Sequence, residues 1–120
     1  MSRDIAKYQV FQQSHRLVLL IYKITHKFPV EERYGLVSQM RRSAYSIPMN
    51  LIEGGFRATE AEFRHFVNMA YGSCAEIQYQ LTLVHDLVYI SENEYMELSN
   101  SYREVGKMLN GLIRKLKAKG

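Results

Sequence analysis

The chain has 120 residues and a single cysteine, Cys74, so its length fits one domain, and the lone thiol excludes an internal disulfide framework and favours a cytoplasmic protein. The longest apolar run, residues 17–22, is far shorter than the ~18 residues of a membrane span, and residues 1–4 lack the apolar core of a signal peptide. Sixteen Lys and Arg against 12 Asp and Glu leave a net charge of +4, a mild basic bias rather than a nucleic-acid signature.

Apolar residues recur at helical spacing in four stretches, and almost no strand pattern competes with them. The first, from Val10 to Phe28 with Ser14 as its weak position, predicts a helix over about 4–27. The second, from Leu36 to Leu51, predicts a helix over 35–53. The third and fourth are unbroken heptad patterns that predict helices over 59–89 and 92–118. Their members are Phe63, Val67, Ala70, Cys74, Ile77, Leu81, Val84 and Val88, then Tyr95, Leu98, Tyr102, Val105, Leu109, Leu112 and Leu116.

Residues typical of helix ends lie between these stretches. Pro29 follows the first, and Gly54-Gly55 follows the second as a predicted stop signal. Residues 59–62 and 91–94 each match a capping box, in which a hydroxyl and a carboxylate bond the free N–H groups of a helix start. Short connections force neighbouring helices to run antiparallel, so residues 1–120 are predicted to form an all-α, up-down-up-down four-helix bundle.

Pro48 lies inside the second predicted helix and has two interpretations. In the structural one, which we favour, Pro48 bends the helix, Asn50 bonds a freed backbone group and Gly54 ends the helix. In the functional one, Asn50 and Glu53 form a binding point near the basic end of the bundle.

The predicted topology separates the charges along the bundle. Both termini and residues 54–58 share one end, which carries eight Lys and Arg against four Asp and Glu, a net charge of +4. The opposite end carries six acidic residues against two basic ones, a net charge of −4, and the middle carries +4. The molecule is therefore expected to be polar along its long axis.

The positive end, with His65 nearby, is suited to binding phosphate groups. The alternative is structural, because Lys and Arg in the last turn of a helix stabilise it by interacting with the helix dipole. Arg41 and Arg42 differ because they lie mid-helix beside Tyr45 and Gln39, and Arg with Tyr suits either nucleic acid or a protein interface. The candidate nucleic-acid-binding residues are Arg41, Arg42, Arg57, Arg64, Arg114, Lys115, Lys117 and Lys119.

Nothing in the sequence supports catalysis, a metal site or a cofactor. Glu62-x-x-His65 matches half of a di-iron bundle motif, but only one copy exists and the capping box already uses Glu62. Cys74 lies in a heptad core position, which predicts an inert thiol.

Three elements in order resemble the 23S rRNA intervening-sequence protein family over roughly residues 8–90. They are Phe28-Pro29 followed by Gly35-Leu36, then Arg41-Arg42, then Ile47-Pro48 with Asn50 and Glu53-Gly54. The third predicted helix continues the match with Glu62-Phe63, Phe66, Ala70, Gly72-Ser73 and Glu76. The chain departs at Leu51-Ile52, where the family usually has Ile-Ala, and at Met49, usually a small residue.

The resemblance implies a small cytosolic bacterial protein with the fold of a four-helix bundle. A relative, the accessory protein of diversity-generating retroelements, forms a homopentameric ring and binds nucleic acid and a reverse transcriptase, so a ring-shaped oligomer is expected here by analogy. Two hypotheses follow: a non-catalytic protein that binds structured RNA or DNA through its basic surface, or a scaffold ring that binds a protein partner and buries its arginines and tyrosines between subunits.

Overall fold

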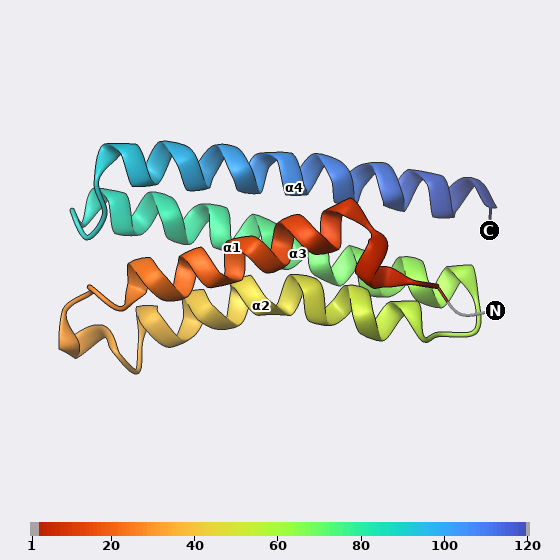
Figure 1. Cartoon of the computed structure of the whole chain (residues 1–120), viewed down its shortest axis with the longest axis horizontal. Coiled ribbons are helices and arrows are strands. Elements are labelled where there is room, and N and C mark those ends of the chain that lie inside the picture. The colour runs from red at the N-terminus through yellow and green to blue at the C-terminus, as the bar shows by residue number, and fades with distance from the viewer. Residues whose placement is uncertain (1–2, 120) are drawn as a thin grey trace.

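In the computed structural model, which describes residues 3–119, four long helices are joined by short connections, and the described chain contains no β-strand. The helices are α1 (Gln9–Thr25), α2 (Leu36–Gly55), α3 (Glu60–Asp86) and α4 (Glu92–Lys119). Single-turn 3₁₀ helices, η1 (Ile5–Lys7) and η2 (Val30–Glu32), precede α1 and α2. The four helices run alternately up and down (Figure 1), which confirms the predicted all-α four-helix bundle.

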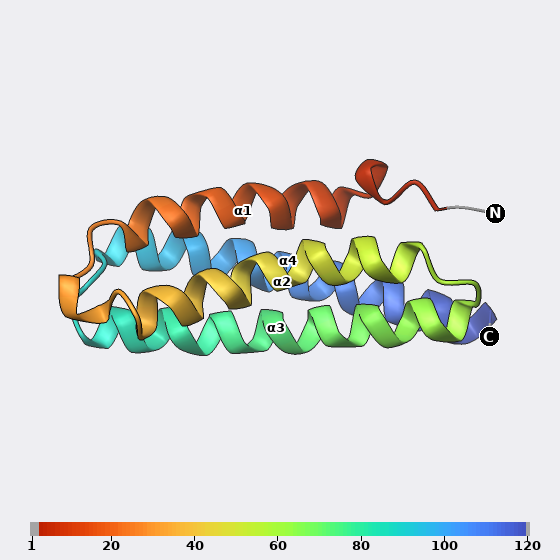
Figure 2. The ribbon, with the colours of Figure 1, turned by 90° about the horizontal axis from the view of Figure 1, so that it is seen from below.

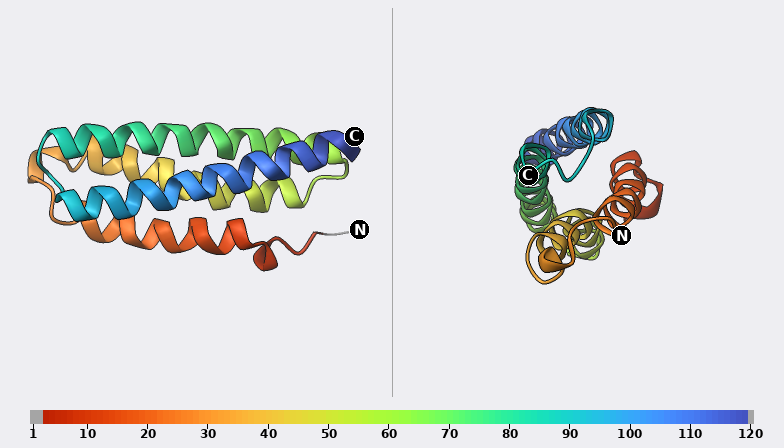
Figure 3. Two further views of the ribbon diagram at one scale, coloured as in Figure 1. Left: turned by 90° about the horizontal axis from the view of Figure 1, so that it is seen from above. Right: turned by 90° about the vertical axis from the view of Figure 1, so that its left-hand side faces the viewer.

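The helices follow one another around the bundle axis. Seen end-on, they lie in the order α1, α2, α3, α4, with the most extensive packing on either side of α3 and the least between α1 and α4 (Figure 3). The start of η1, the α2–α3 connection and the end of α4 lie together at one end of the bundle (Figures 1 and 2). We call this the terminal end, and the other the opposite end.

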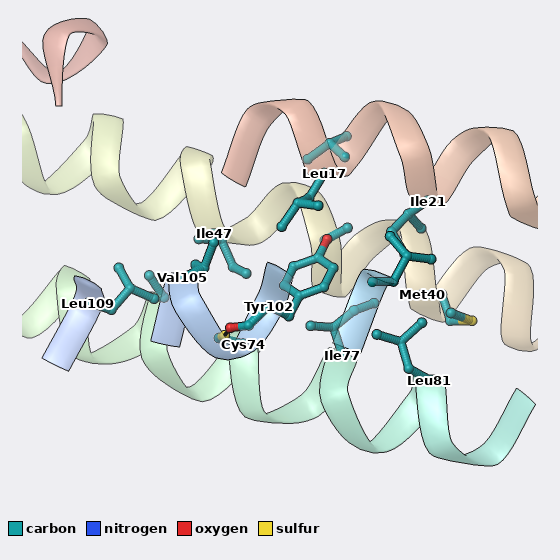
Figure 4. Close-up of a cluster of buried hydrophobic side chains, with 14 of the residues drawn as sticks. Leu17, Ile21, Met40, Ile47, Cys74, Ile77, Leu81, Tyr102, Val105 and Leu109 are labelled. Atoms are coloured by element: carbon teal, nitrogen blue, oxygen red, sulfur yellow. Dashed lines mark hydrogen bonds between the residues drawn. The ribbon is translucent and has the colours of Figure 1, made fainter. Parts of the chain in front are cut away.

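The core contains the side chains that the heptad patterns predict. Figure 4 shows Leu17, Met40, Ile77 and Tyr102 converging from all four helices. Ser14, the weak position of the first pattern, is fully buried, and its hydroxyl donates to the Phe11 carbonyl at 3.1 Å. Tyr95 and Leu112 are only partly buried and pack against the core, and Val88 lies outside it, 84% exposed.

The two largest errors in the predicted helix boundaries come from local backbone conformation. The first helix begins at Gln9 rather than residue 4, since Tyr8 is extended (φ −70°, ψ 132°) and separates η1 from α1. The third ends at Asp86 rather than residue 89, because Val88 adopts a φ of 63° that no helix continues. Both capping boxes are confirmed, with Glu62 N–H donating to Thr59 Oγ1 and Glu94 N–H to Ser91 Oγ, each at 3.1 Å.

The sequence predicted that Gly54 and Gly55 stop the second helix, but this prediction is wrong. Both residues lie in the last turn of α2. A Cβ on Gly54 would lie 2.7 Å from Phe66 Cβ and 3.3 Å from the Phe63 carbonyl oxygen, so this glycine lets α2 approach α3 closely. A Cβ on Gly55 would collide with Ile5 of η1. These two glycines therefore bring three chain segments together at the terminal end.

Pro48 lies inside α2, which bends along its length (Figure 2). Proline lacks the N–H that would bond the Ala44 carbonyl, and such a gap is a usual cause of a helix bend. Asn50 Nδ2 donates to the Ser46 carbonyl at 2.8 Å, so it does not bond the group that Pro48 frees.

Candidate nucleic-acid interface

Arg3 ties the N-terminal segment to the α2–α3 connection at the terminal end. Its guanidinium donates to the carbonyls of Gly55 and Arg57, at 3.3 and 2.8 Å, and pairs with the Glu60 carboxylate at 2.5 Å. The same group lies 4.5 Å from the centre of the Phe63 ring. The hydrogen bond from Arg3 lowers the pKa of Glu60. Arg3 is therefore used inside the molecule and is not free to bind a ligand.

The other carboxylates at the terminal end are also engaged. Glu53 pairs with Arg57 at 2.9 Å, and Asp4 pairs with Lys7 at 3.6 Å. Glu62 accepts the Thr59 N–H at 3.3 Å in the capping box. Three of the four carboxylates at this end are thus paired with a cation, and only Glu62, which bonds neutral groups, is left to offset the remaining positive charge.

Six cations at this end make up what we call the basic pole. They are Arg57, Arg64, Arg114, Lys115, Lys117 and Lys119. Arg57 pairs with Glu53 and lies 4.6 Å from the centre of the Phe66 ring. The other five form no ion pair with any described residue, and all but the half-buried Arg64 are exposed. His65 is exposed in the same turn of α3.

A hollow of about 480 Å³ opens between the start of α3 and the end of α4. Lys115 and Lys119 line it from α4, while Arg3, Tyr8 and Glu60 line it from the N-terminal segment and α3. The structure therefore brings the α4 tail beside the α2–α3 connection, as the predicted topology requires.

The structure does not bring Arg41 and Arg42 to the basic pole. Arg41 is sixteen residues from Arg57, and most of that span is helical, which corresponds to roughly 24 Å along α2. The Arg41 guanidinium donates to Thr25 Oγ1 at 3.0 Å and lies 4.4 Å from the centre of the Tyr22 ring. Arg41 is therefore half-buried against the last turns of α1, while Arg42 is exposed.

An apolar groove of about 540 Å³ lies between α1 and α2 and was not predicted from the sequence. Phe11, His15 and Val18 line it from α1, and Tyr45, Pro48, Met49, Ile52 and Glu53 line it from α2. Met49 is 60% exposed there. The one sequence feature that could have indicated this groove is side-chain size, because Met49 and Ile52 occupy positions where the family usually has smaller residues.

The remaining candidate residues have structural contacts. Asn50 bonds within its own helix and Glu53 pairs with Arg57. Of the structural interpretation of the Pro48 region only the bend of α2 is found, because Asn50 does not bond the freed carbonyl and Gly54 does not end the helix. Cys74 is buried, and burial raises the pKa of its thiol. Its Sγ donates to the Tyr102 carbonyl at 3.3 Å, in keeping with a core thiol. Within residues 3–119, no helix has the length and apolar character needed to cross a membrane.

Comparison with known proteins identifies a family and a similar solved structure. The model of a family described as 23S rRNA-intervening sequence protein matches residues 6–111. A crystal structure at 1.70 Å resolution of a protein of unknown function from the S23 ribosomal protein family of Bacteroides thetaiotaomicron is similar, with a TM-score of 0.76 and 28% identity. The similarity covers 87% of this chain and 97% of that one. No curated protein matches the chain.

Proposed function

The chain belongs to the 23S rRNA-intervening sequence protein family, and we propose that it is a non-catalytic protein that binds structured RNA through its basic pole. The observation that carries the proposal is the charge balance at the terminal end. Three of the four acidic residues there are paired with cations, and Glu62 bonds only neutral groups of the capping box. Arg64, Arg114, Lys115, Lys117 and Lys119 therefore face a single carboxylate and keep a net charge of +4. Phosphate groups are the ligands that such a surface attracts most strongly.

The proposed interaction has a measurable signature in salt. Binding to a nucleic acid releases the counterions that its phosphates hold, and the logarithm of the affinity falls by about 0.7–0.9 per phosphate for each tenfold rise in salt. If the five unpaired cations each contact one phosphate, the slope is roughly −4.

The test is a fluorescence-anisotropy titration of a labelled, blunt-ended RNA hairpin between 50 and 300 mM salt. We expect tight binding at low salt, a steep slope, and a large loss of affinity in the double variant Lys115→Glu/Lys119→Glu. The matched control is Arg16→Glu/Lys23→Glu, which changes the net charge equally on exposed positions of α1. Absence of binding at 50 mM salt, or equal losses in both double variants, would overturn the proposal.

A second candidate function is a ring-shaped scaffold that assembles through the α1–α2 face, as a pentamer by analogy with the retroelement accessory protein. The observation that favours it is the apolar groove between α1 and α2, with Met49 60% exposed and Ile52 37% exposed. Light scattering tests it, because Met49→Glu/Ile52→Glu is expected to lower the mass of the assembly. A wild-type mass of 14.1 kDa at micromolar concentration would exclude a ring.

The double variant Arg41→Glu/Arg42→Glu separates two roles for these arginines. If they contact RNA, the affinity falls while the mass of the assembly stays unchanged. If they lie between subunits, the mass falls instead.

A further inference from the structure

A second hollow, of about 440 Å³, lies between α3 and α4 on the outside of the bundle. Arg103, Lys107 and Asn110 line it from α4, and Tyr71, Ala75 and Gln78 line it from α3. We call these six residues and the hollow between them the α3–α4 groove. Arg103, Lys107 and Asn110 point away from the core. The core-facing side of α4 is formed instead by Tyr102, Val105 and Leu109, which are buried.

The groove is the first part of a longer basic stripe along α4. Arg103, Lys107, Asn110, Arg114 and Lys117 follow one another at alternating spacings of four and three residues, which places all five on one face of the helix. From Arg103 to Lys117 this face is roughly 21 Å long. The stripe therefore runs from the middle of the bundle into the basic pole.

The facing side of α3 has the same continuity. Arg64, Tyr71, Ala75 and Gln78 are spaced by seven, four and three residues and share one face. The two helices are antiparallel, and Cys74 fixes their register because its Sγ donates to the Tyr102 carbonyl and faces Gly106. Counting from that contact, Arg64 lies across from the turn of α4 that holds Arg114 and Lys117.

Negative charge is scarce along this path. Glu104 is the acidic residue nearest to the stripe on α4, and its exposed carboxylate lies 3.5 Å from Lys107 Nζ. Glu76 on α3 accepts a hydrogen bond from Ser43 of α2 at 2.8 Å, on the other flank of that helix. Arg103 donates to the Asn100 side chain and forms no ion pair with a described residue.

We propose that the α3–α4 groove holds a single strand of nucleic acid that continues from the basic pole, an inference that rests on the proposed function. The groove lies between two packed helices whose axes are about 8–10 Å apart, so it is narrower than a duplex, which would touch only its rims. Phosphates lie along the cations of α4, amides of Gln78 and Asn110 bond sugar or base edges, and a base stacks on Tyr71, whose side chain is 43% exposed.

The first test compares a labelled 12-nucleotide oligouridine with the blunt-ended hairpin. The groove variant is Arg103→Gln/Lys107→Gln, and the control is Arg16→Gln/Lys23→Gln, which removes the same charge from exposed positions of α1. We expect the groove variant to bind oligouridine at least about tenfold more weakly, with a salt slope reduced by roughly 0.7–1.4 because Lys107 is paired with Glu104, and to bind the hairpin normally.

The outcomes separate this inference from the function on which it rests. If Lys115→Glu/Lys119→Glu loses the hairpin but the groove variant retains oligouridine, the groove inference is wrong and the basic pole stands. If the wild-type protein binds neither RNA at 50 mM salt, both proposals fail. If the groove variant and its control weaken oligouridine binding equally, only net charge matters and the groove is not the site.

A second variant tests the groove without changing charge. Ala75 is exposed and lines the hollow, so Ala75→Phe fills the groove while leaving the core intact. We expect weaker binding of oligouridine, with unchanged helix content by circular dichroism. Unchanged oligouridine affinity in this variant would overturn the placement of the strand.

Discussion

Tyr102 places a phenol group in the centre of the bundle, where it reaches from α4 towards Leu17 of α1 (Figure 4). The residue is fully buried, and its hydroxyl has no hydrogen-bond partner among the described residues. A buried hydroxyl without a partner loses its bonds to water and gains none in return. The heptad pattern predicted the position of Tyr102 in the core, but a pattern of apolar spacing contains no information on what its hydroxyl meets.

Replacing that hydroxyl is expected to stabilise the protein. Tyr102→Phe keeps the ring that packs against its neighbours and removes the unpaired polar atom. We expect the free energy of unfolding to rise by about 1 kcal/mol, measured by urea denaturation at pH 7. A decrease of that size would show that the hydroxyl has a partner that stabilises the fold.

The same burial predicts how this gain depends on pH. Burial raises the pKa of Tyr102 above the value of about 10 that an unfolded chain has, so the unfolded state loses this proton first. Above pH ~10 folding must therefore also return a proton to Tyr102, so this residue lowers the free energy of unfolding further as the pH rises, whereas below pH ~10 it adds no pH dependence. Urea denaturation at several pH values should show the advantage of Tyr102→Phe increasing above pH 10, and a constant advantage would contradict this assignment.

At the scale of the helix, spacing alone predicted which residues belong to which element. Helix periodicity is a local property of the sequence. The apolar residues that recur between Val10 and Phe28 and between Phe63 and Val84 were therefore predicted correctly to face the core. The boundaries at Tyr8 and Val88 were not predicted, because single backbone conformations set them. Gly54 and Gly55 were misread as a stop signal, since their close contacts come from Phe66 and Ile5, which lie in other elements.

Replacing Gly54 or Gly111 with alanine is expected to change stability in opposite directions, depending on which atoms the added methyl group would contact. A Cβ on Gly54 would lie 2.7 Å from Phe66 Cβ, whereas one on Gly111 of α4 would meet nothing within 4 Å. Gly111→Ala is expected to stabilise the protein by about 1 kcal/mol through helix propensity, and Gly54→Ala to destabilise it by about 1–3 kcal/mol through overpacking. Thermal unfolding of the two variants checks the pair, and equal effects would show that α2 and α3 are not in close contact.

At the scale of the whole molecule, the sequence predicted the segregation of charge because short connections fix the up-down topology. The terminal end does gather the α4 tail, the α2–α3 connection and the start of the chain (Figure 1). The sequence could not predict that Arg3 and Arg41 are used for internal contacts, nor that a groove opens beside Arg103. Those features depend on the register between helices, as in the contact of Arg3 with residues more than fifty positions away.

The most direct test of the central claim, that RNA binds at the terminal end, is lysine footprinting. The protein is acetylated with a lysine-reactive ester, with and without the RNA hairpin, and each site is quantified by mass spectrometry. The account predicts that RNA protects Lys115, Lys117 and Lys119 and leaves Lys23 and Lys27, which lie towards the opposite end, as reactive as before. Equal protection of all five lysines, or protection of Lys27 alone, would contradict it.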